Sequence, residues 1–370
     1  MNTEELGSGV FPGQTHSDRR FRRSQPRPGK TPKAGVAGSN PAGGTGAEAP
    51  DRSWSGAFGV WSWHPLKSPI HLAHGSRCLA ATVACMTLSA STSQAVDLRV
   101  KPVDEVLDRV ARSLHVRLLL DTVVRKRRSV GARTDRETWV RIERRLLDKI
   151  TDQGWNGAEC AARLDGVAQP AWQGCVVWRD TTEPVMWRAD ETDLLPAPPV
   201  GSAILSEAPE LPDEWWDGLN ASLDALTAHR TGRLATPDTE SITQASVTES
   251  IRAVFSGDFD TTVQRWVPAH ADLNWANITA PVFSLFDWED WGNAPQGLDS
   301  ASLWGSSLAV PSLADRVRHE RRRDFESRDG KLMTLFVCSK MLGPYAHPAD
   351  PRLEPARRMA EQVIEELQAD

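Results

Sequence analysis

Residues 266–291 contain the side chains of this sequence whose types and spacing best suit chemistry. The segment reads WVPAHADLNWANITAPVFSLFDWEDW and orders its polar residues as His270-x-Asp272-x-x-x-x-Asn277, with Asp287 further along. One carboxylate can meet an acceptor hydroxyl, while an amide oxygen and a second carboxylate can hold Mg²⁺ on a triphosphate. The set therefore predicts phosphoryl transfer.

Two apolar runs flank this set and predict short buried strands at 266–270 and 282–286. A loop between two such strands would bring Asp272, Asn277 and Asp287 to one edge, where three oxygen ligands suit a hard cation. The structural alternative is an Asp that caps a turn, an Asn that fills another turn and an Asp at a strand end.

The stretch HADLNWANITAP, followed by LFDWEDWGNAPQGLD, resembles the aminoglycoside phosphotransferase family, a branch of the protein-kinase-like fold. Family members show His-Gly-Asp-x-x-x-x-Asn and then an Ile/Leu-Asp-Trp-Glu segment. Here Ala271 stands in place of the usual Gly and leaves the chemical residues intact. The clear match covers about residues 265–308.

The resemblance implies a role for each residue of the motif. Asp272 would be the catalytic base or the residue that orients the hydroxyl, and Asp299 would brace the catalytic loop. Asn277 and Asp287 would bind Mg²⁺. His270 is an alternative base, because imidazole titrates near neutral pH. A supporting role for His270 is favoured, because a base must reach the reacting proton and Asp272 has that place.

The resemblance implies an α+β, bilobal protein-kinase-like fold, and hydrophobic periodicity around the motif predicts helices and strands that suit it. This fold would have a small, mostly antiparallel β N-lobe with one main helix and a larger, mostly α-helical C-lobe. In the N-lobe we expect a helix at 103–111, a strand at 117–124, a hairpin of 129–133 and 138–143, a helix at 156–164, and strands at 176–178 and 184–188. In the C-lobe we expect helices at 212–230, 242–255, 299–310, 311–327, 331–341 and 353–367.

Composition divides the chain into regions. Residues 1–95 are rich in Arg, Pro, Gly and Ala without an apolar period, so they are expected to be disordered or a mis-annotated extension, with translation beginning at Met86. The nucleotide-holding N-lobe is expected at 100–195 and an acidic, Pro-rich hinge at 189–201. The C-lobe, with the catalytic and acceptor groups, is expected at 202–370.

The cation that would grip the nucleotide phosphates is the weakest part of the pattern. In a kinase-like fold a helix Glu pairs with a strand Lys. Glu159 is the helix candidate, but the strand position in TWVRIE holds Arg141, whose rigid fork is not equivalent to an ammonium group. Arg141 and the nearby Lys149 both stay open as the source of the charge. An outward-facing Arg141 is the structural alternative.

Composition also disfavours several classes of protein. The 370 residues are 40% hydrophobic and 25% charged, which is typical of a globular chain, and the net charge of −6 argues against a nucleic-acid partner. Five cysteines form no CxxC pair, as expected of reduced thiols in the cytoplasm. No apolar run reaches the roughly 18 residues of a membrane span, so no membrane partner is expected.

The resulting hypothesis is an ATP- and Mg²⁺-dependent phosphotransferase that moves the γ-phosphate to a hydroxyl of a small molecule, assisted near the metal by Glu289 or Asp290. The alternative is a catalytically degenerate, kinase-like nucleotide-binding or scaffold protein that has lost the strand Lys. A hydrolase is disfavoured, because neither G-x-S-x-G nor H-E-x-x-H occurs. The acceptor, the nucleotide preference and the oligomeric state stay open.

Overall fold

A computed structural model describes residues 96–150, 153–237, 240–344 and 346–369 of the chain. The expectation for residues 1–95 falls outside this part of the chain.

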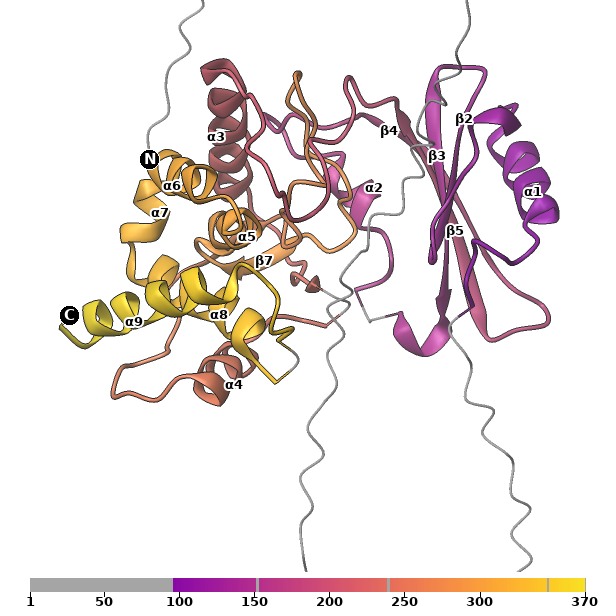
Figure 1. The fold of residues 1–370 in the computed structure, drawn as a ribbon. Helices are drawn as coiled ribbons and strands as arrows, with labels where there is room; N and C mark the ends of the chain where they lie inside the picture. The colour runs from indigo at the N-terminus through magenta and orange to yellow at the C-terminus, as the bar shows by residue number, and fades with distance from the viewer. Residues whose placement is uncertain (1–95, 151–152, 238–239, 345, 370) are drawn as a thin grey trace, which may run out of the picture. The chain divides into compact units, whose positions relative to one another are not determined.

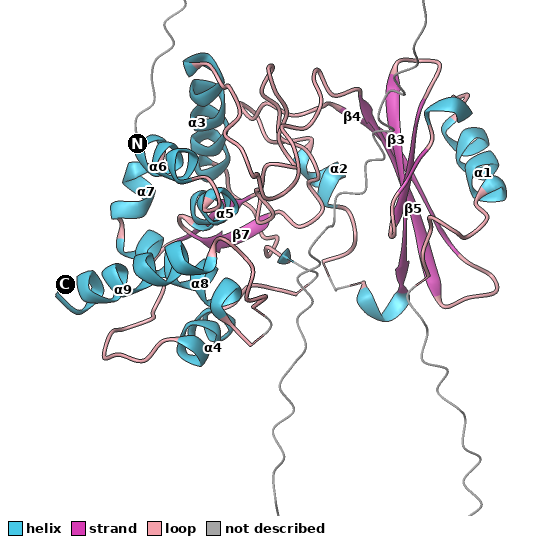
Figure 2. Cartoon of the chain, viewed as in Figure 1, coloured by secondary structure: helices cyan, strands magenta, loops and turns pink. Residues whose placement is uncertain are grey.

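The described residues build two separate hydrophobic cores. The N-lobe core gathers buried side chains between Leu98 and Ala189, and the C-lobe core gathers those between Ala161 and Leu367. Figure 2 shows that most strands belong to the N-lobe and most helices to the C-lobe. The predicted two-lobed α+β fold is confirmed, whereas the domain boundaries stay a prediction.

The N-lobe is an antiparallel sheet with the strand order β1-β2-β3-β5-β4. Its strands are β1 (Val124–Arg125), β2 (Ser129–Arg133), β3 (Thr138–Leu146), β4 (Trp172–Arg179) and β5 (Val185–Asp193). Helix α1 (Asp104–Leu114) covers one face of the sheet, and the short helix α2 (Gly157–Ala161) lies on the other side (Figure 1).

Strand β3 divides its side chains between these two faces. Val140 and Ile142 belong to the N-lobe core together with residues of α1. Because successive side chains of a strand point to opposite faces, Arg141, Glu143 and Arg145 share the face away from α1. This alternation places three charged side chains of one strand on the side of the sheet that contains α2.

Most of the expected N-lobe elements are present. The hairpin forms with Ser129 opposite Glu143. The strand expected at 176–178 lies within β4, and the one expected at 184–188 coincides with the start of β5 to within one residue. Strand β5 runs to Asp193, so the first residues of the expected hinge belong to the sheet.

Two N-lobe predictions are wrong in extent. The strand expected at 117–124 is replaced by a 3₁₀ turn, η1 (Leu120–Thr122), and by the two residues of β1. The Thr122 hydroxyl donates to the Leu119 carbonyl at 2.6 Å, which favours the turn over a strand ladder. The helix expected at 156–164 reaches only from Gly157 to Ala161, because the chain then continues in single turns.

The C-lobe is built from helices around a two-stranded sheet. Its helices are α3 (Asp213–Ala228), α4 (Gln244–Val254), α5 (Leu298–Ser307), α6 (Pro311–Glu320), α7 (Arg322–Glu326), α8 (Arg328–Leu342) and α9 (Leu353–Ala369). Its strands are β6 (Trp266–Ala269) and β7 (Gly292–Pro295), which pair antiparallel. The helix expected at 311–327 is divided at Arg321, which has a non-helical φ of −106° and ψ of 27°.

The strand expected at 282–286 is also wrong, because β7 and not this run pairs with β6. The run forms only an isolated bridge, between Ile278 and Leu285. The Phe286 amide donates to the Asn277 carbonyl at 3.1 Å as part of this bridge, whereas the Leu285 amide donates to the carbonyl of Ala168 at 2.7 Å. The apolar side chains therefore mark a buried loop.

Among the described residues, we find no helix with the length and apolar character that crossing a membrane would require.

Candidate active site

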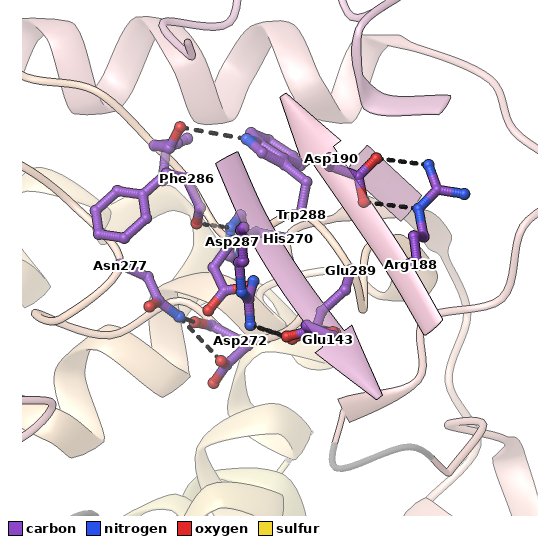
Figure 3. A network of polar contacts seen from close by, with 12 residues as sticks. Glu143, Arg188, Asp190, His270, Asp272, Asn277, Phe286, Asp287, Trp288 and Glu289 are labelled. Atoms are coloured by element: carbon purple, nitrogen blue, oxygen red, sulfur yellow. Dashed lines mark hydrogen bonds and ion pairs between the residues drawn. The ribbon is translucent and has the colours of Figure 1, made fainter. Parts of the chain in front are cut away.

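The loop that follows β6 holds the predicted base and the predicted metal amide side by side. Asn277 donates its Nδ2 hydrogens to the Asp272 carbonyl at 2.8 Å and to Asp272 Oδ2 at 2.9 Å (Figure 3). Asn274 donates to the same carbonyl at 3.0 Å and to Asp272 Oδ1 at 3.1 Å. Both carboxylate oxygens of Asp272 are thus oriented by amides of its own loop.

Helix α5 is joined to this loop through Asp299. The buried Asp299 carboxylate accepts the backbone N–H groups of His270 at 2.7 Å and Ala271 at 2.8 Å. Burial raises the pKa of Asp299, and the two amides and the neighbouring His270 act in the opposite direction. The side chain holds the backbone immediately before Asp272.

His270 is fully buried and contacts the segment that leads into Asp287. Its Nε2 donates to the Phe286 carbonyl at 2.9 Å, and its ring meets the edge of Trp288 with centroids 4.7 Å apart (Figure 3). Burial lowers the pKa of His270, so the ring is neutral at neutral pH. These contacts connect the Asp272 loop to the Asp287 loop.

Both loops contain one residue with left-handed backbone. Ala271 has a φ of 68° and Asp287 a φ of 71°. An L-residue with a Cβ is strained in this region, whereas Gly is not and Asp is only mildly disfavoured. The position where Ala replaces the Gly of the resembled family is therefore a position that favours Gly.

Ala271→Gly should leave stability unchanged or raise the free energy of unfolding by up to about 1 kcal/mol, because it relieves the left-handed strain. The matched variant Ala269→Gly, in the extended strand β6, should lower it by about 1 kcal/mol. Urea unfolding of the three proteins measures both effects. Equal destabilisation by the two substitutions would contradict the strain at Ala271.

Arg141 reaches from β3 to the predicted metal carboxylate. Its guanidinium forms ion pairs with Asp287 and with Glu143, and Nη2 lies 3.0 Å from Glu289 Oε1. Arg145, on the same strand face, pairs with Glu289 and lies 3.9 Å from Glu143. The charged face of β3 thereby meets the Asp287–Glu289 segment.

The carboxylates of this cluster differ in proton affinity. Burial raises the pKa of Glu143 to about 8, although Arg141 works against the shift. Burial also disfavours a charged Glu289, but Arg141 and Arg145 hold the pKa of Glu289 below its usual range. Within this coupled pair, Glu143 has the higher proton affinity and Glu289 the lower.

Glu143→Gln should flatten the dependence of stability on pH between about pH 5 and pH 8. A raised folded-state pKa gives stability that is complete below the unfolded-state pKa and is lost as pH rises through the folded-state value. The free energy of unfolding of the wild type should therefore fall across this window, and that of Glu143→Gln should fall less. Urea titrations at three pH values test this, with the exposed Glu105→Gln as control. Parallel curves for all three proteins would contradict the raised pKa of Glu143.

Glu159, the helix candidate, does not pair with Arg141 at the strand position. Glu159 pairs instead with Arg188 of β5, at 3.4 Å, and Arg188 also forms two hydrogen bonds of 2.6 Å with Asp190. The short helix α2 packs against β4, the edge strand next to β5, so its Glu reaches β5 before β3. Whether Glu159 contributes to nucleotide binding stays a prediction.

Two lysines, Lys149 and Lys126, are candidates for the phosphate cation besides Arg141. Lys149 is exposed in the 3₁₀ turn η2 (Leu147–Lys149) and lines a small pocket together with Arg145 and Glu289. Lys126, which sequence reasoning missed, lies in the β1–β2 turn, where its N–H donates to the Ser129 carbonyl at 2.8 Å.

Charged groups of the candidate site act on the pKa of Lys126. Burial lowers the pKa of Lys126, and so does the positive charge of Arg141. The negative charges of Asp287 and Glu143 act in the opposite direction. The signal in the sequence is the basic run at 125–128 between two strands. Periodicity alone does not show that this turn lies near Asp287.

The donor types near Asp287 fit a hard divalent cation. No group of three His, Cys, Asp or Glu side chains arranged to hold a metal occurs in the described part of the chain. Asn277 and Asp287 offer an amide oxygen and a carboxylate, and Mg²⁺ characteristically takes one or two such ligands from the protein and the rest from phosphates and water. Asn277 donates the hydrogens of Nδ2 to Asp272, so its Oδ1 is the atom that can bind a cation.

Glu289 and Asp290 differ in what they contact. Glu289 is engaged by Arg141 and Arg145, whereas Asp290 Oδ1 accepts the hydroxyl of Thr236 at 3.1 Å. Burial, followed by the charge of Glu289, raises the pKa of Asp290 well above its usual range. An assisting role near a metal stays a prediction for both residues.

No protein-family model matches the chain, and no curated protein sequence is similar to it. Solved structures with a similar fold include a thermostable mutant of aminoglycoside phosphotransferase APH(4)-Ia in a ternary complex with AMP-PNP and hygromycin B. It is 14% identical, with 68% of this chain and 93% of that chain covered and a TM-score of 0.42. A choline/ethanolamine kinase family protein from Mesorhizobium loti is 11% identical, with 72% and 94% covered and a TM-score of 0.40. Choline kinase LicA from Streptococcus pneumoniae is 12% identical, with 71% and 98% covered and a TM-score of 0.40.

Proposed function

We infer that the protein is an ATP-dependent phosphotransferase that moves the γ-phosphate to a hydroxyl of a small molecule. Asp272 is the base, Asn277 and Asp287 are the Mg²⁺ ligands, and the charged face of β3 lies on the phosphate side. The acceptor is a small molecule with at least one free hydroxyl.

One observation carries the proposal: Asn277 links the predicted base to the loop that holds the predicted metal carboxylate. Its side chain donates to Asp272 Oδ2 at 2.9 Å, and its backbone carbonyl accepts the N–H of Phe286, the residue before Asp287, at 3.1 Å. A structural turn would need neither the side-chain bond to a carboxylate nor the link to a second acidic loop. A transferase needs both, because base and metal must be held in one geometry.

In the proposed reaction the acceptor oxygen forms a bond to the γ-phosphorus, the bond to the β–γ bridging oxygen breaks, and ADP leaves. Asp272 receives the hydroxyl proton, with its carboxylate held by Asn274 and Asn277. When bound, Mg²⁺ would neutralise charge on the triphosphate. Asp299 holds the backbone before Asp272, and His270 connects it to the loop of Asp287.

The phosphate cation would come from Arg141 or from Lys126. Arg141 sits on β3 and already touches Asp287, whereas Lys126 offers the compact ammonium group that β3 lacks. The charges of Asp287 and Glu143 act on both groups, and an anionic ligand bound there would attract both cations.

A second candidate is a degenerate nucleotide-binding or scaffold protein. The ion pair between Arg141 and Asp287 favours it, because a guanidinium already neutralises the carboxylate that a metal would need. Both candidates bind a nucleotide, but only the phosphotransferase transfers a phosphoryl group to an acceptor.

The test is a phosphoryl-transfer assay with a panel of hydroxylated acceptors that includes choline, simple sugars and aminoglycosides. We expect ADP to appear together with a phosphate monoester detected by ³¹P NMR, for at least one acceptor class. Nucleotide binding without ester formation from any acceptor would favour the degenerate protein.

A further inference from the structure

Arg141 forms an ion pair with Asp287, the predicted metal carboxylate. Its Nη1 pairs with Asp287 Oδ1, and its Nη2 lies 3.0 Å from Glu289 Oε1, so one planar group bridges two acidic side chains. The Arg141 and Asp287 side chains are only 34% and 24% exposed, so the pair is partly shielded from water and from salt.

Two cations compete for this carboxylate. A divalent ion on Asp287 would lie within a few ångströms of the guanidinium, and charges at such distances in a partly buried site repel strongly. Arg141 cannot relieve the repulsion by losing its proton, because a guanidinium stays charged in proteins. Unless a new anion draws it away, Arg141 therefore opposes metal binding.

A triphosphate is an anion that can draw it away. Guanidinium groups bind phosphate oxygens through two parallel hydrogen bonds, as they bind carboxylates. The phosphate side of the site also contains Arg145 on the same strand face and Lys126 in the neighbouring turn. An incoming nucleotide thus finds cations on β3 while it supplies oxygen ligands to the metal.

We propose that Arg141 is a resident counter-cation of Asp287 that excludes divalent metal from the free protein and moves to the phosphates when nucleotide binds. Metal entry is thereby coupled to nucleotide entry. This inference rests on the proposed function, because it assigns the metal to Asp287.

The experiment measures Mn²⁺ binding to the full chain by electron paramagnetic resonance, without nucleotide and with AMP-PNP. The proteins compared are the wild type, Arg141→Gln and Arg145→Gln. The Arg145 variant is the matched control, since it removes the same charge from the same strand face and pairs with Glu289 and Glu143. Arg141→Gln combined with Asp287→Asn shows whether any gained site uses Asp287.

We expect Arg141→Gln to bind Mn²⁺ without nucleotide about tenfold more tightly than the wild type, or better, and Arg145→Gln to gain clearly less. Adding Asp287→Asn should remove the gain. The wild type should bind Mn²⁺ tightly only with AMP-PNP.

If Arg141→Gln does not fold, the double variant Arg141→Gln/Glu143→Gln replaces it. It removes the Arg141 cation together with the Glu143 carboxyl group that pairs with it, and the same tenfold gain is expected of it.

Equal affinities of the free wild type and of Arg141→Gln, with tight binding of both in the presence of AMP-PNP, would overturn the inference and leave the proposed function standing. Equal gains in Arg141→Gln and Arg145→Gln would also overturn it, because they would reflect net charge alone. Absence of Mn²⁺ binding in every state would overturn both the inference and the metal site of the proposed function.

Discussion

Asp272→Asn is expected to lower the rate of phosphoryl transfer by about a hundredfold to ten-thousandfold, which is the usual contribution of a positioned base. The carboxylate is the group that would receive the acceptor proton, and an amide of the same size cannot do so. ATP affinity should change little, because Asn277 can still donate to the Asp272 carbonyl, to which its amide lies at 2.8 Å. Initial rates of ADP formation and calorimetric ATP titration measure the two quantities.

The matched control is Asp315→Asn, the same substitution at an exposed position on α6. It should have wild-type rates and affinity. Wild-type turnover in Asp272→Asn would contradict the role of Asp272 as the base. Loss of both ATP binding and turnover would indicate that Asp272 has a structural role instead.

Asp299→Ala is expected to lower the free energy of unfolding by roughly 2–5 kcal/mol, because it leaves two buried N–H groups without their acceptor. These are the amides of His270 and Ala271, which donate to Asp299 at 2.7 and 2.8 Å. The backbone before Asp272 would lose its link to α5, so transfer activity should fall as well. Urea unfolding measures the stability change, and Asp315→Ala serves as the exposed control.

A loss of less than about 0.5 kcal/mol, the range of ordinary surface substitutions, would contradict the account of Asp299. Asp299→Asn provides an intermediate case. Its single carbonyl oxygen can accept one amide well, while its NH₂ group would face the other donor, so a smaller but measurable loss is expected.

Relations within a few residues were accessible from the sequence. Asp272 and Asn277 lie five positions apart in one loop, and their spacing alone predicts that they meet. The β2–β3 hairpin follows from the alternation of apolar and polar residues on both sides of a short turn. The strand at 282–286 was mispredicted, because an apolar run predicts burial and does not show which backbone groups it will pair with.

Contacts between residues far apart in the chain could not be predicted from the sequence. The sequence shows that Arg141, Glu143 and Arg145 share a strand face, but only the tertiary arrangement shows that this face meets Asp287 and Glu289. The partner of Glu159 could not be predicted for the same reason, since it depends on which strand α2 covers.

The charge of the β1–β2 turn was missed because a basic run between strands is more often a solvated loop. Lys126 becomes a candidate for the phosphate cation only because the charges of Arg141 and Asp287 act on it in the folded protein.

The most direct test of the central claim is a calorimetric titration of ATP into the full chain with Mg²⁺ and with EDTA, for the wild type and for Asp287→Asn. Asn tolerates the left-handed backbone of this position, whose φ is 71°, so the substitution should not disturb the loop. We expect tight binding to the wild type only with Mg²⁺, and we expect Asp287→Asn to bind ATP with Mg²⁺ no better than without it. Equal ATP affinity in all four titrations, or no binding in any, would contradict a metal-dependent nucleotide site at Asp287.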